Sequence, residues 1–152
     1  KNFKIYDSAS NLLQYLKSRG FLNIVITNQP DVEAGLITIQ TLNRMHNFLK
    51  KELEIDDIEV CPHQSSSKCR RRKPNAGMLV DSGNKWGIDF SKSYFIGDRK
   101  SDIDAGNKVG IKSIFIDHNY NEKKPLNANF YSDNLSDAVN YILLNDATSG
   151  SW

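Results

Sequence analysis

Three carboxylates lie close together in the second half of the chain, at Asp98, Asp102 and Asp104. They follow residues 94–97, a short apolar run with the composition of a buried strand. Acids at this spacing repel one another unless a cation or the positive end of a helix dipole compensates their charge. The stretch is therefore compatible with a site for a hard cation such as Mg²⁺. It is also compatible with a helix start at which Ser101 or Asp102 is the N-cap and the other acids complement the helix dipole.

Two further groups of residues have the chemistry to bind phosphate. Thr27, Asn28 and Gln29 offer a hydroxyl, side-chain amides and the backbone N–H groups of a turn. Residues 70–74, Arg-Arg-Arg-Lys-Pro, supply a dense run of cations. Each group also has a simpler interpretation, because Thr-Asn-Gln is ordinary turn composition and a basic run is often a solvated loop. Together with Asp98 they offer charge neutralisation, a metal ligand and positioning, which phosphoryl transfer requires.

The elements predicted around these residues alternate between helix and strand. Apolar runs predict strands at residues 22–27, 57–61, 94–96, 112–117 and, as an edge strand, 130–131. Apolar spacing and stop signals predict helices at residues 7–19, 38–53, 76–85, 101–109 and 136–144. Residues 28–31 are predicted as a turn and residues 64–73 as a loop. This alternation implies an α/β fold with a doubly wound parallel sheet, in which ligands bind beyond the carboxyl ends of the strands. We therefore expect Thr27 and Asp98 to face one crevice.

Length and composition are those of an ordinary globular domain. The chain has 152 residues, of which 39% are hydrophobic and 25% charged. A net charge of +2 is too small to indicate a nucleic-acid or anionic membrane partner. No apolar run approaches the roughly 20 residues that a bilayer span requires. We expect one domain over residues 1–146, a tail at 147–152, and a cytoplasmic monomer that acts on a small molecule.

The two cysteines, Cys61 and Cys69, enclose His63. They could form a disulfide, but an imidazole placed between two thiols favours a metal site. So few cysteines are also compatible with a reducing, cytoplasmic compartment. His46 lies among the apolar residues of a predicted helix, and we interpret it as structural.

The order of these motifs resembles that of the haloacid dehalogenase (HAD) superfamily. The matching residues are Thr-Asn-Gln at 27–29, Cys-Pro-His at 61–63, Arg-Lys-Pro at 72–74, Gly-Met at 77–78 and Gly-Asp at 97–98. Within the superfamily, the chain is similar to the D-glycero-D-manno-heptose bisphosphate and histidinol-phosphate phosphatases, to about Leu144. Cys-Pro-His followed by Arg-Lys-Pro is the most specific element of this resemblance. It implies a HAD-like Rossmannoid fold and a Mg²⁺-dependent phosphatase that forms an aspartyl-phosphate, which water then hydrolyses.

The resemblance also implies roles for individual residues. Thr27 and Asn28 would hold the transferring phosphate, with Gln29 beside them. Lys73 would neutralise the phosphoryl charge, and Arg72 would contact the substrate. The remaining implied roles are Asp98 as Mg²⁺ ligand, Asp102 as an acid supporting the metal site, and Arg99 near the substrate.

The nucleophile of the family has no counterpart in this sequence. The family's first motif, Asp-x-Asp-Gly on the first strand, supplies the nucleophile, the general acid and most Mg²⁺ ligands. It does not occur in residues 1–152, because Asp102 and Asp104 are not followed by Gly. We therefore expect the first strand of the sheet to lie upstream of Lys1.

A second departure concerns zinc. Members of the branch bind Zn²⁺ through Cys-x-His and Cys-x-Cys pairs, which provide four tetrahedral ligands. Cys61, His63 and Cys69 match three of these positions, and Arg71 occupies the fourth. Three ligands could hold Zn²⁺ with water completing the shell; the alternative is a reduced, metal-free loop.

The resemblance therefore favours a Mg²⁺-dependent phosphatase for a small sugar phosphate. Heptose bisphosphate is the first expected substrate and histidinol phosphate the second. A different class of function is also open, a catalytically inactive HAD-like remnant that acts as a binding module. A phosphotransferase or mutase is disfavoured, because the chain has no room for a large cap domain.

Overall fold

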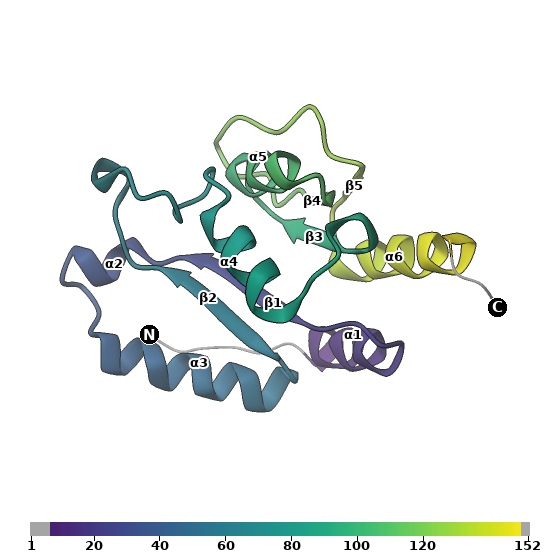
Figure 1. The fold of residues 1–152 in the computed structure, drawn as a ribbon, viewed down its shortest axis with the longest axis horizontal. Coiled ribbons are helices and arrows are strands. Elements are labelled where there is room, and N and C mark those ends of the chain that lie inside the picture. Colours follow the sequence, from purple (N-terminus) through teal and green to yellow (C-terminus); the bar gives the residue numbers. More distant parts are fainter. Residues whose placement is uncertain (1–6, 150–152) are drawn as a thin grey trace. The chain divides into compact units, whose positions relative to one another are not determined.

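The computed structural model describes residues 7–149, which belong to two compact units, 1–68 and 69–152. Figure 1 shows the elements of both units as a ribbon. The sequence predicted one domain over residues 1–146, and that the two units make a single domain remains a prediction. None of the helices described between residues 7 and 149 combines the length and hydropathy that a membrane span requires.

The first unit is built on two parallel strands. Its elements are α1 (Asp7–Ser18), β1 (Ile24–Asn28), α2 (Pro30–Glu33), α3 (Ile39–Leu53), β2 (Asp57–Cys61) and the 3₁₀ turn η1 (Ser65–Ser67). β1 and β2 pair in register from Ile24 opposite Asp57 to Asn28 opposite Cys61. The N-cap of α3 is Thr38, whose side chain accepts a hydrogen bond of 3.1 Å from the N–H of Thr41. The carboxyl ends of both strands therefore lie side by side in this unit.

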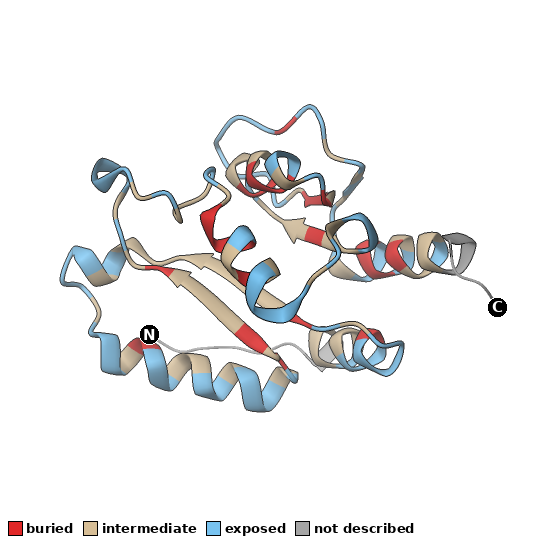
Figure 2. Ribbon diagram, viewed as in Figure 1, coloured by how far each residue is buried: buried red, intermediate tan, exposed pale blue. Residues whose placement is uncertain are grey.

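The second unit contains a three-stranded parallel sheet in the order β3-β4-β5. Its elements are α4 (Gly77–Trp86), the 3₁₀ turn η2 (Phe90–Lys92), β3 (Tyr94–Gly97), α5 (Lys100–Val109), β4 (Lys112–Ile116), β5 (Phe130–Ser132) and α6 (Leu135–Ser149). Buried positions gather on β4 and on the inner turns of α4, α5 and α6 (Figure 2). The side chains at the centre are Met78, Ile103, Ile114 and Val139, none more than 1% exposed.

Close packing of α5 on the sheet depends on Gly106. A Cβ at this position would lie 2.8 Å from Ser113 Oγ and 3.1 Å from the Phe95 ring. Because there is no room for a side chain, the helix rests directly on β3 and β4. This contact sets the position of the α5 N-terminus, where the predicted acid cluster lies.

The prediction of an α/β fold with parallel sheets is confirmed, including β5 as an edge strand. The predicted turn at residues 28–31 is wrong in part, because Pro30 begins the short helix α2. Proline is tolerated at a first helical position, where its missing N–H would have no partner in the helix. α6 continues to Ser149 instead of ending at Leu144, so it includes the first residues of the predicted tail. The rest of that tail, 150–152, lies outside the described residues.

Candidate active site

Asp102 is the most connected acid at the start of α5. It is the third residue of the helix and only 5% exposed. Its Oδ2 accepts hydrogen bonds from the backbone N–H groups of Asp98 (3.2 Å) and Arg99 (3.1 Å). Its Oδ1 accepts a bond of 2.5 Å from Lys73 Nζ. The interpretation of Ser101 or Asp102 as the N-cap is wrong, because Arg99 is the N-cap. Asp102 lies within the first turn of the helix, and its side chain accepts a hydrogen bond from the backbone N–H of Arg99, which has no partner within the helix.

The residue before Asp98 makes this arrangement possible. Gly97 ends β3, and a Cβ there would lie 2.6 Å from Oδ2 of Asp102. Any side chain at position 97 would therefore push the buried carboxylate away from the turn. Glycine at position 97 therefore allows Asp102 to lie close to the end of β3.

The ion pair between Lys73 and Asp102 is shielded from water. Only 11% of the Lys73 side chain and 6% of the Asp102 side chain are exposed. Two charges buried this far are stable only when paired and hydrogen-bonded. The Lys73 amine is therefore held at a defined place in the second unit, beside the turn that carries Asp98.

Asp98 follows β3 directly and is half-buried. Its Oδ2 accepts a hydrogen bond of 2.9 Å from the hydroxyl of Tyr120, which lies in the loop after β4. This hydrogen bond raises the pKa of the Tyr120 phenol above its ordinary value. Sequence patterns had not singled out Tyr120, because its loop is polar and has no periodicity.

The two arginines predicted to contact substrate differ in their surroundings. Arg99 is exposed, and its Nη1 lies 2.7 Å from Oε2 of Glu122, in the same loop as Tyr120. Its guanidinium carbon also lies 4.8 Å from the centre of the Tyr120 ring. Arg72 belongs to the turn before α4, where its backbone N–H donates to the carbonyl of Cys69 at 3.1 Å.

The predicted phosphate cradle lies in the first unit, at the carboxyl end of β1. Thr27 and Asn28 are the last residues of the strand. Gln29 donates through Nε2 to Thr27 Oγ1 (3.1 Å) and through its backbone N–H to the carbonyl of Cys61 (2.7 Å). These bonds hold Gln29 against Thr27 and against the end of β2. That Thr27 and Asp98 face one crevice remains a prediction.

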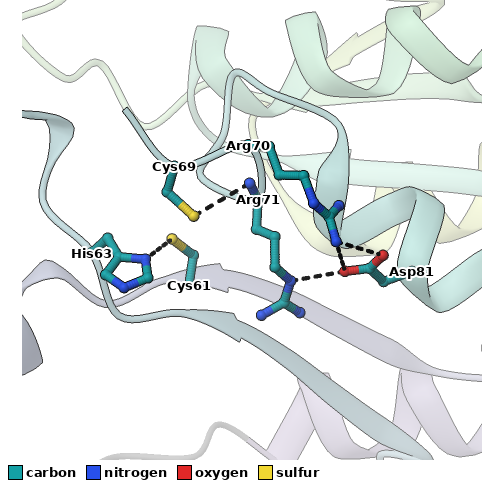
Figure 3. A network of polar contacts seen from close by, with 6 residues as sticks. All are labelled: Cys61, His63, Cys69, Arg70, Arg71 and Asp81. Carbon is teal, nitrogen blue, oxygen red and sulfur yellow. Dashed lines mark hydrogen bonds and ion pairs between the residues drawn. The ribbon is translucent and has the colours of Figure 1, made fainter. Parts of the chain in front are cut away.

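The loop after β2 is attached to α2 by Glu33. The carboxylate of Glu33 accepts hydrogen bonds from Ser67 Oγ at 2.6 and 2.8 Å and from the N–H of Gln64 at 2.5 Å. These bonds hold the pKa of Glu33 below its ordinary value, the serine having the larger effect. At the start of this loop, Cys61 Sγ and His63 Nδ1 lie 3.9 Å apart (Figure 3).

Cys69 and Arg71 begin the second unit, and Arg71 points toward α4 (Figure 3). Arg71 Nε donates to Oδ2 of Asp81 at 2.9 Å, and Arg70 Nη2 lies 3.2 and 3.3 Å from the two oxygens of the same carboxylate. The backbone N–H of Arg71 donates to Cys69 Sγ at 3.4 Å. The positive charge at the position of the fourth zinc ligand is thus paired with an acid of α4. Neither Cys61 nor Cys69 is in a disulfide in the structure, so the disulfide interpretation is not supported.

Comparison with known proteins identifies the family. A family model described as HAD-hydrolase-like matches residues 70–139. The D-glycero-alpha-D-manno-heptose-1,7-bisphosphate 7-phosphatase of Campylobacter jejuni is 30% identical over 149 residues, which cover 93% of this chain and 83% of that protein. The chain belongs to the HAD-like hydrolases. This membership confirms the resemblance seen in the order of the motifs.

Two further proteins are similar to this chain. The D-glycero-beta-D-manno-heptose-1,7-bisphosphate 7-phosphatase of Rhodopseudomonas palustris is 32% identical over 111 residues. The match covers 65% of this chain and 62% of that protein, less than two thirds of its length. A crystal structure of D,D-heptose 1.7-bisphosphate phosphatase from B. bronchiseptica complexed with magnesium and phosphate has a TM-score of 0.81 at 21% identity. The alignment covers 92% of this chain and 84% of that one, and it supports the HAD-like α/β fold.

Proposed function

We propose that this HAD-like protein is a Mg²⁺-dependent phosphatase that hydrolyses a small sugar phosphate. The observation that carries the proposal is the buried pair of Lys73 and Asp102, which fixes an amine beside the turn bearing Asp98. A fixed cation and an adjacent carboxylate are what a transferring phosphoryl group requires. Membership of the family, with relatives named as phosphatases, supports the same reaction class.

Asp98 is suited to hold Mg²⁺. One of its oxygens accepts from Tyr120, and no other hydrogen bond to its side chain is found within residues 7–149. Both oxygens of Asp102 have partners, so we assign Asp102 a supporting role through Lys73 and the turn backbone. Mg²⁺ prefers carboxylate oxygens and retains several waters. When bound, it would neutralise charge on the phosphoryl oxygens.

The remaining site residues have roles in binding and orientation. Thr27 and Asn28 hold phosphate at the end of β1, and the amide of Gln29 orients the Thr27 oxygen. Lys73 neutralises the phosphoryl charge. Arg72 and Arg99 contact the rest of the substrate.

The nucleophile is proposed to lie outside residues 1–152, on a strand that ends in Asp-x-Asp-Gly. The aspartate of this motif forms the aspartyl-phosphate in the family's reaction, and the motif does not occur in the sequence. Intact mass of the natural protein tests the proposal. A mass clearly above 17.3 kDa is expected, and a folded, active protein of 17.3 kDa would contradict it.

The preferred substrate is proposed to be a heptose bisphosphate. The relatives from Campylobacter jejuni and Rhodopseudomonas palustris carry this substrate in their names. Histidinol phosphate is the second candidate, because a histidine biosynthesis bifunctional protein HisB from Baumannia cicadellinicola is 32% identical over 116 residues, 32% of that protein's length. Phosphate release from both compounds, with and without Mg²⁺, tests the choice. Binding of either compound without release of phosphate would favour the inactive binding module instead.

We also propose that Cys61, His63 and Cys69 bind Zn²⁺. Cys61 and His63 present a thiol and an imidazole nitrogen to each other in the first unit. Cys69 Sγ accepts a hydrogen bond of 3.4 Å from the backbone N–H of Arg71 in the second unit. Thiolate and imidazole are the ligands that Zn²⁺ prefers. Elemental analysis of protein prepared without chelator should find about one zinc per chain; its absence would establish the metal-free loop.

The quaternary state and location belong to the same proposal. We expect a cytoplasmic monomer. Light scattering coupled to gel filtration should give the mass of one chain. A mass of two chains at micromolar concentration would show that the monomer is wrong.

A further inference from the structure

The loop between β4 and β5 contacts two residues of the proposed site at once. Tyr120 donates its hydroxyl hydrogen to Oδ2 of Asp98 at 2.9 Å. Two residues later, Glu122 Oε2 lies 2.7 Å from Nη1 of Arg99. Asp98 and Arg99 are neighbours in the turn before α5, so consecutive site residues are each bound by a residue of the same loop.

The loop has its own internal support close to Tyr120. Asp117 accepts a hydrogen bond of 2.8 Å from the N–H of Asn119 and one of 2.7 Å from Lys124 Nζ. Lys124 Nζ also lies 3.3 Å from the side-chain oxygen of Asn119. These bonds join both sides of the segment that carries Tyr120 and Glu122. The side chains of Tyr120 and Glu122 therefore project from a loop segment whose two ends are held together by hydrogen bonds.

The contact between Tyr120 and Asp98 has a direct consequence for a cation ligand. A carboxylate on a strand end rotates about its last side-chain bond unless one oxygen is held. The phenol holds Oδ2, and no other hydrogen bond to the Asp98 side chain is found in the described part of the chain. Oδ1 is then kept in one orientation, which reduces the entropy lost when a metal binds.

The contact between Glu122 and Arg99 restrains the residue that is proposed to contact the substrate. The Arg99 guanidinium lies over the Tyr120 ring, 4.8 Å from its centre, and donates to Glu122 beyond it. A ring and a carboxylate together restrict a side chain that would otherwise sample many rotamers. Arg99 therefore has a preferred direction although 54% of its side chain is exposed.

We propose that Tyr120 and Glu122 are positioning residues, Tyr120 for the Mg²⁺ ligand Asp98 and Glu122 for the substrate-contacting Arg99. The proposal rests on the proposed function, because it takes Asp98 as the metal ligand and Arg99 as a substrate contact. It adds that metal affinity and substrate affinity are set separately, by two residues of one loop. Each residue can therefore be tested with its own readout.

The first test measures Mg²⁺ binding to the full-length protein by calorimetry, without substrate. Tyr120→Phe keeps the ring beneath Arg99 and removes only the hydroxyl. Because hydrogen bonds to charged groups are stronger than neutral ones, we expect the Kd for Mg²⁺ to rise about threefold to tenfold. The matched control is Tyr15→Phe, at an exposed tyrosine of α1, which should leave the Kd unchanged. A Kd for Tyr120→Phe equal to that of the wild type would overturn the role of Tyr120.

The second test measures steady-state kinetics of Glu122→Gln at saturating Mg²⁺. Exposed ion pairs are weak, so we expect KM to rise about twofold to fivefold with kcat nearly unchanged. The Kd for Mg²⁺ should stay at the wild-type value. Glu52→Gln, at an exposed position of α3, is the matched control and should change none of these quantities. An unchanged KM for Glu122→Gln would overturn the role of Glu122.

Asp98→Asn separates failure of this inference from failure of the proposed function. If Asp98→Asn leaves Mg²⁺ binding intact, Asp98 is not the metal ligand, and both the proposed site and the role of Tyr120 are wrong. If Asp98→Asn abolishes Mg²⁺ binding while Tyr120→Phe has no effect, only the positioning role is wrong. Loss of binding in Asp98→Asn with weakened binding in Tyr120→Phe supports both.

Discussion

Lys73 and Asp102 form a buried ion pair, with 2.5 Å between Nζ and Oδ1 and at most 11% of either side chain exposed. The pair joins the basic turn before α4 to the first turn of α5. The other oxygen of Asp102 accepts the backbone N–H of Asp98. One carboxylate therefore positions both the amine and the turn that carries the proposed Mg²⁺ ligand.

Asp102→Asn should lower the free energy of unfolding by about 3–5 kcal/mol, because it leaves the buried ammonium of Lys73 without its counter-charge. Phosphatase activity should fall as well, since the amine loses its fixed position. Urea unfolding followed by circular dichroism measures the first effect.

Asp104→Asn is the control for this substitution in the same helix. Asp104 pairs with Lys100 one turn away, and 29% and 38% of the two side chains are exposed. Such a pair contributes about 0.3–0.5 kcal/mol. Equal losses of unfolding free energy in the Asp102 and Asp104 variants would show that the buried ion pair stabilises the protein no more than the exposed one.

Gly97→Ala should disturb the site by steric conflict with Asp102. A methyl group at position 97 would lie 2.6 Å from Oδ2 of Asp102, and we expect a loss of about 1–3 kcal/mol together with most of the activity. Gly87→Ala is a useful comparison, because Gly87 caps α4 with φ of +63° and has no neighbour within 4 Å of the added methyl. Because alanine is strained in this left-handed conformation, the substitution should cost about 1–2 kcal/mol and leave activity intact. Activity that survives in Gly97→Ala would refute the steric argument.

The arrangement of elements could be predicted from the sequence because its strands are short and apolar. Residues 94–96 and 112–117 alternate with helical patterns, and this alternation indicates parallel pairing without any knowledge of contacts. The order of motifs predicted Lys73 and Asp98 as site residues, and this assignment remains a prediction. The short helix at Pro30 was missed because a proline in a polar stretch indicates a turn as readily as a first helical turn.

The roles of individual site residues were harder to predict, since they depend on tertiary neighbours. The sequence predicted Asp102 as an N-cap or as an acid supporting the metal site. Its oxygens accept hydrogen bonds from Lys73, 29 residues earlier, and from the turn before the helix, so the N-cap prediction is wrong and the supporting role remains a prediction. Tyr120 and Glu122 lie in a polar loop with no periodic pattern. Only the folded chain shows that they contact Asp98 and Arg99.

His46 should make stability depend on pH near neutrality. Burial, with a smaller effect of Lys50, lowers the pKa of His46 below its ordinary 6.5. At a pH between the pKa of His46 in the folded chain and its pKa in the unfolded chain, His46 is protonated mainly in the unfolded chain. The contribution of His46 to the free energy of unfolding is therefore fully present above about pH 6.5, and it is lost as the pH drops toward the pKa of His46 in the folded chain.

Melting temperatures between pH 5 and 8 test this prediction. His46→Gln should flatten the decline of the melting temperature below pH 6.5, whereas His118→Gln, at an exposed position, should retain it. A wild-type melting temperature that rises on acidification through this range would contradict the assigned sign.

Arg71→Cys should increase the affinity for Zn²⁺, because it adds a thiolate at the position of the fourth ligand. The substitution also removes the ion pair of 2.9 Å with Asp81. Arg71→Ser removes the same ion pair without adding a ligand, and it should leave the affinity unchanged or lower. Competition with a chromogenic chelator compares the two variants, and equal affinities in both would argue against a metal site at this loop.

The most direct test is phosphate release from D-glycero-D-manno-heptose 1,7-bisphosphate by the full-length protein. We expect release that requires Mg²⁺, stops on chelation, and falls by about 100-fold or more in both Asp98→Ala and Lys73→Ala. Full activity in both variants would contradict the assignment of these residues to a phosphoryl-transfer site.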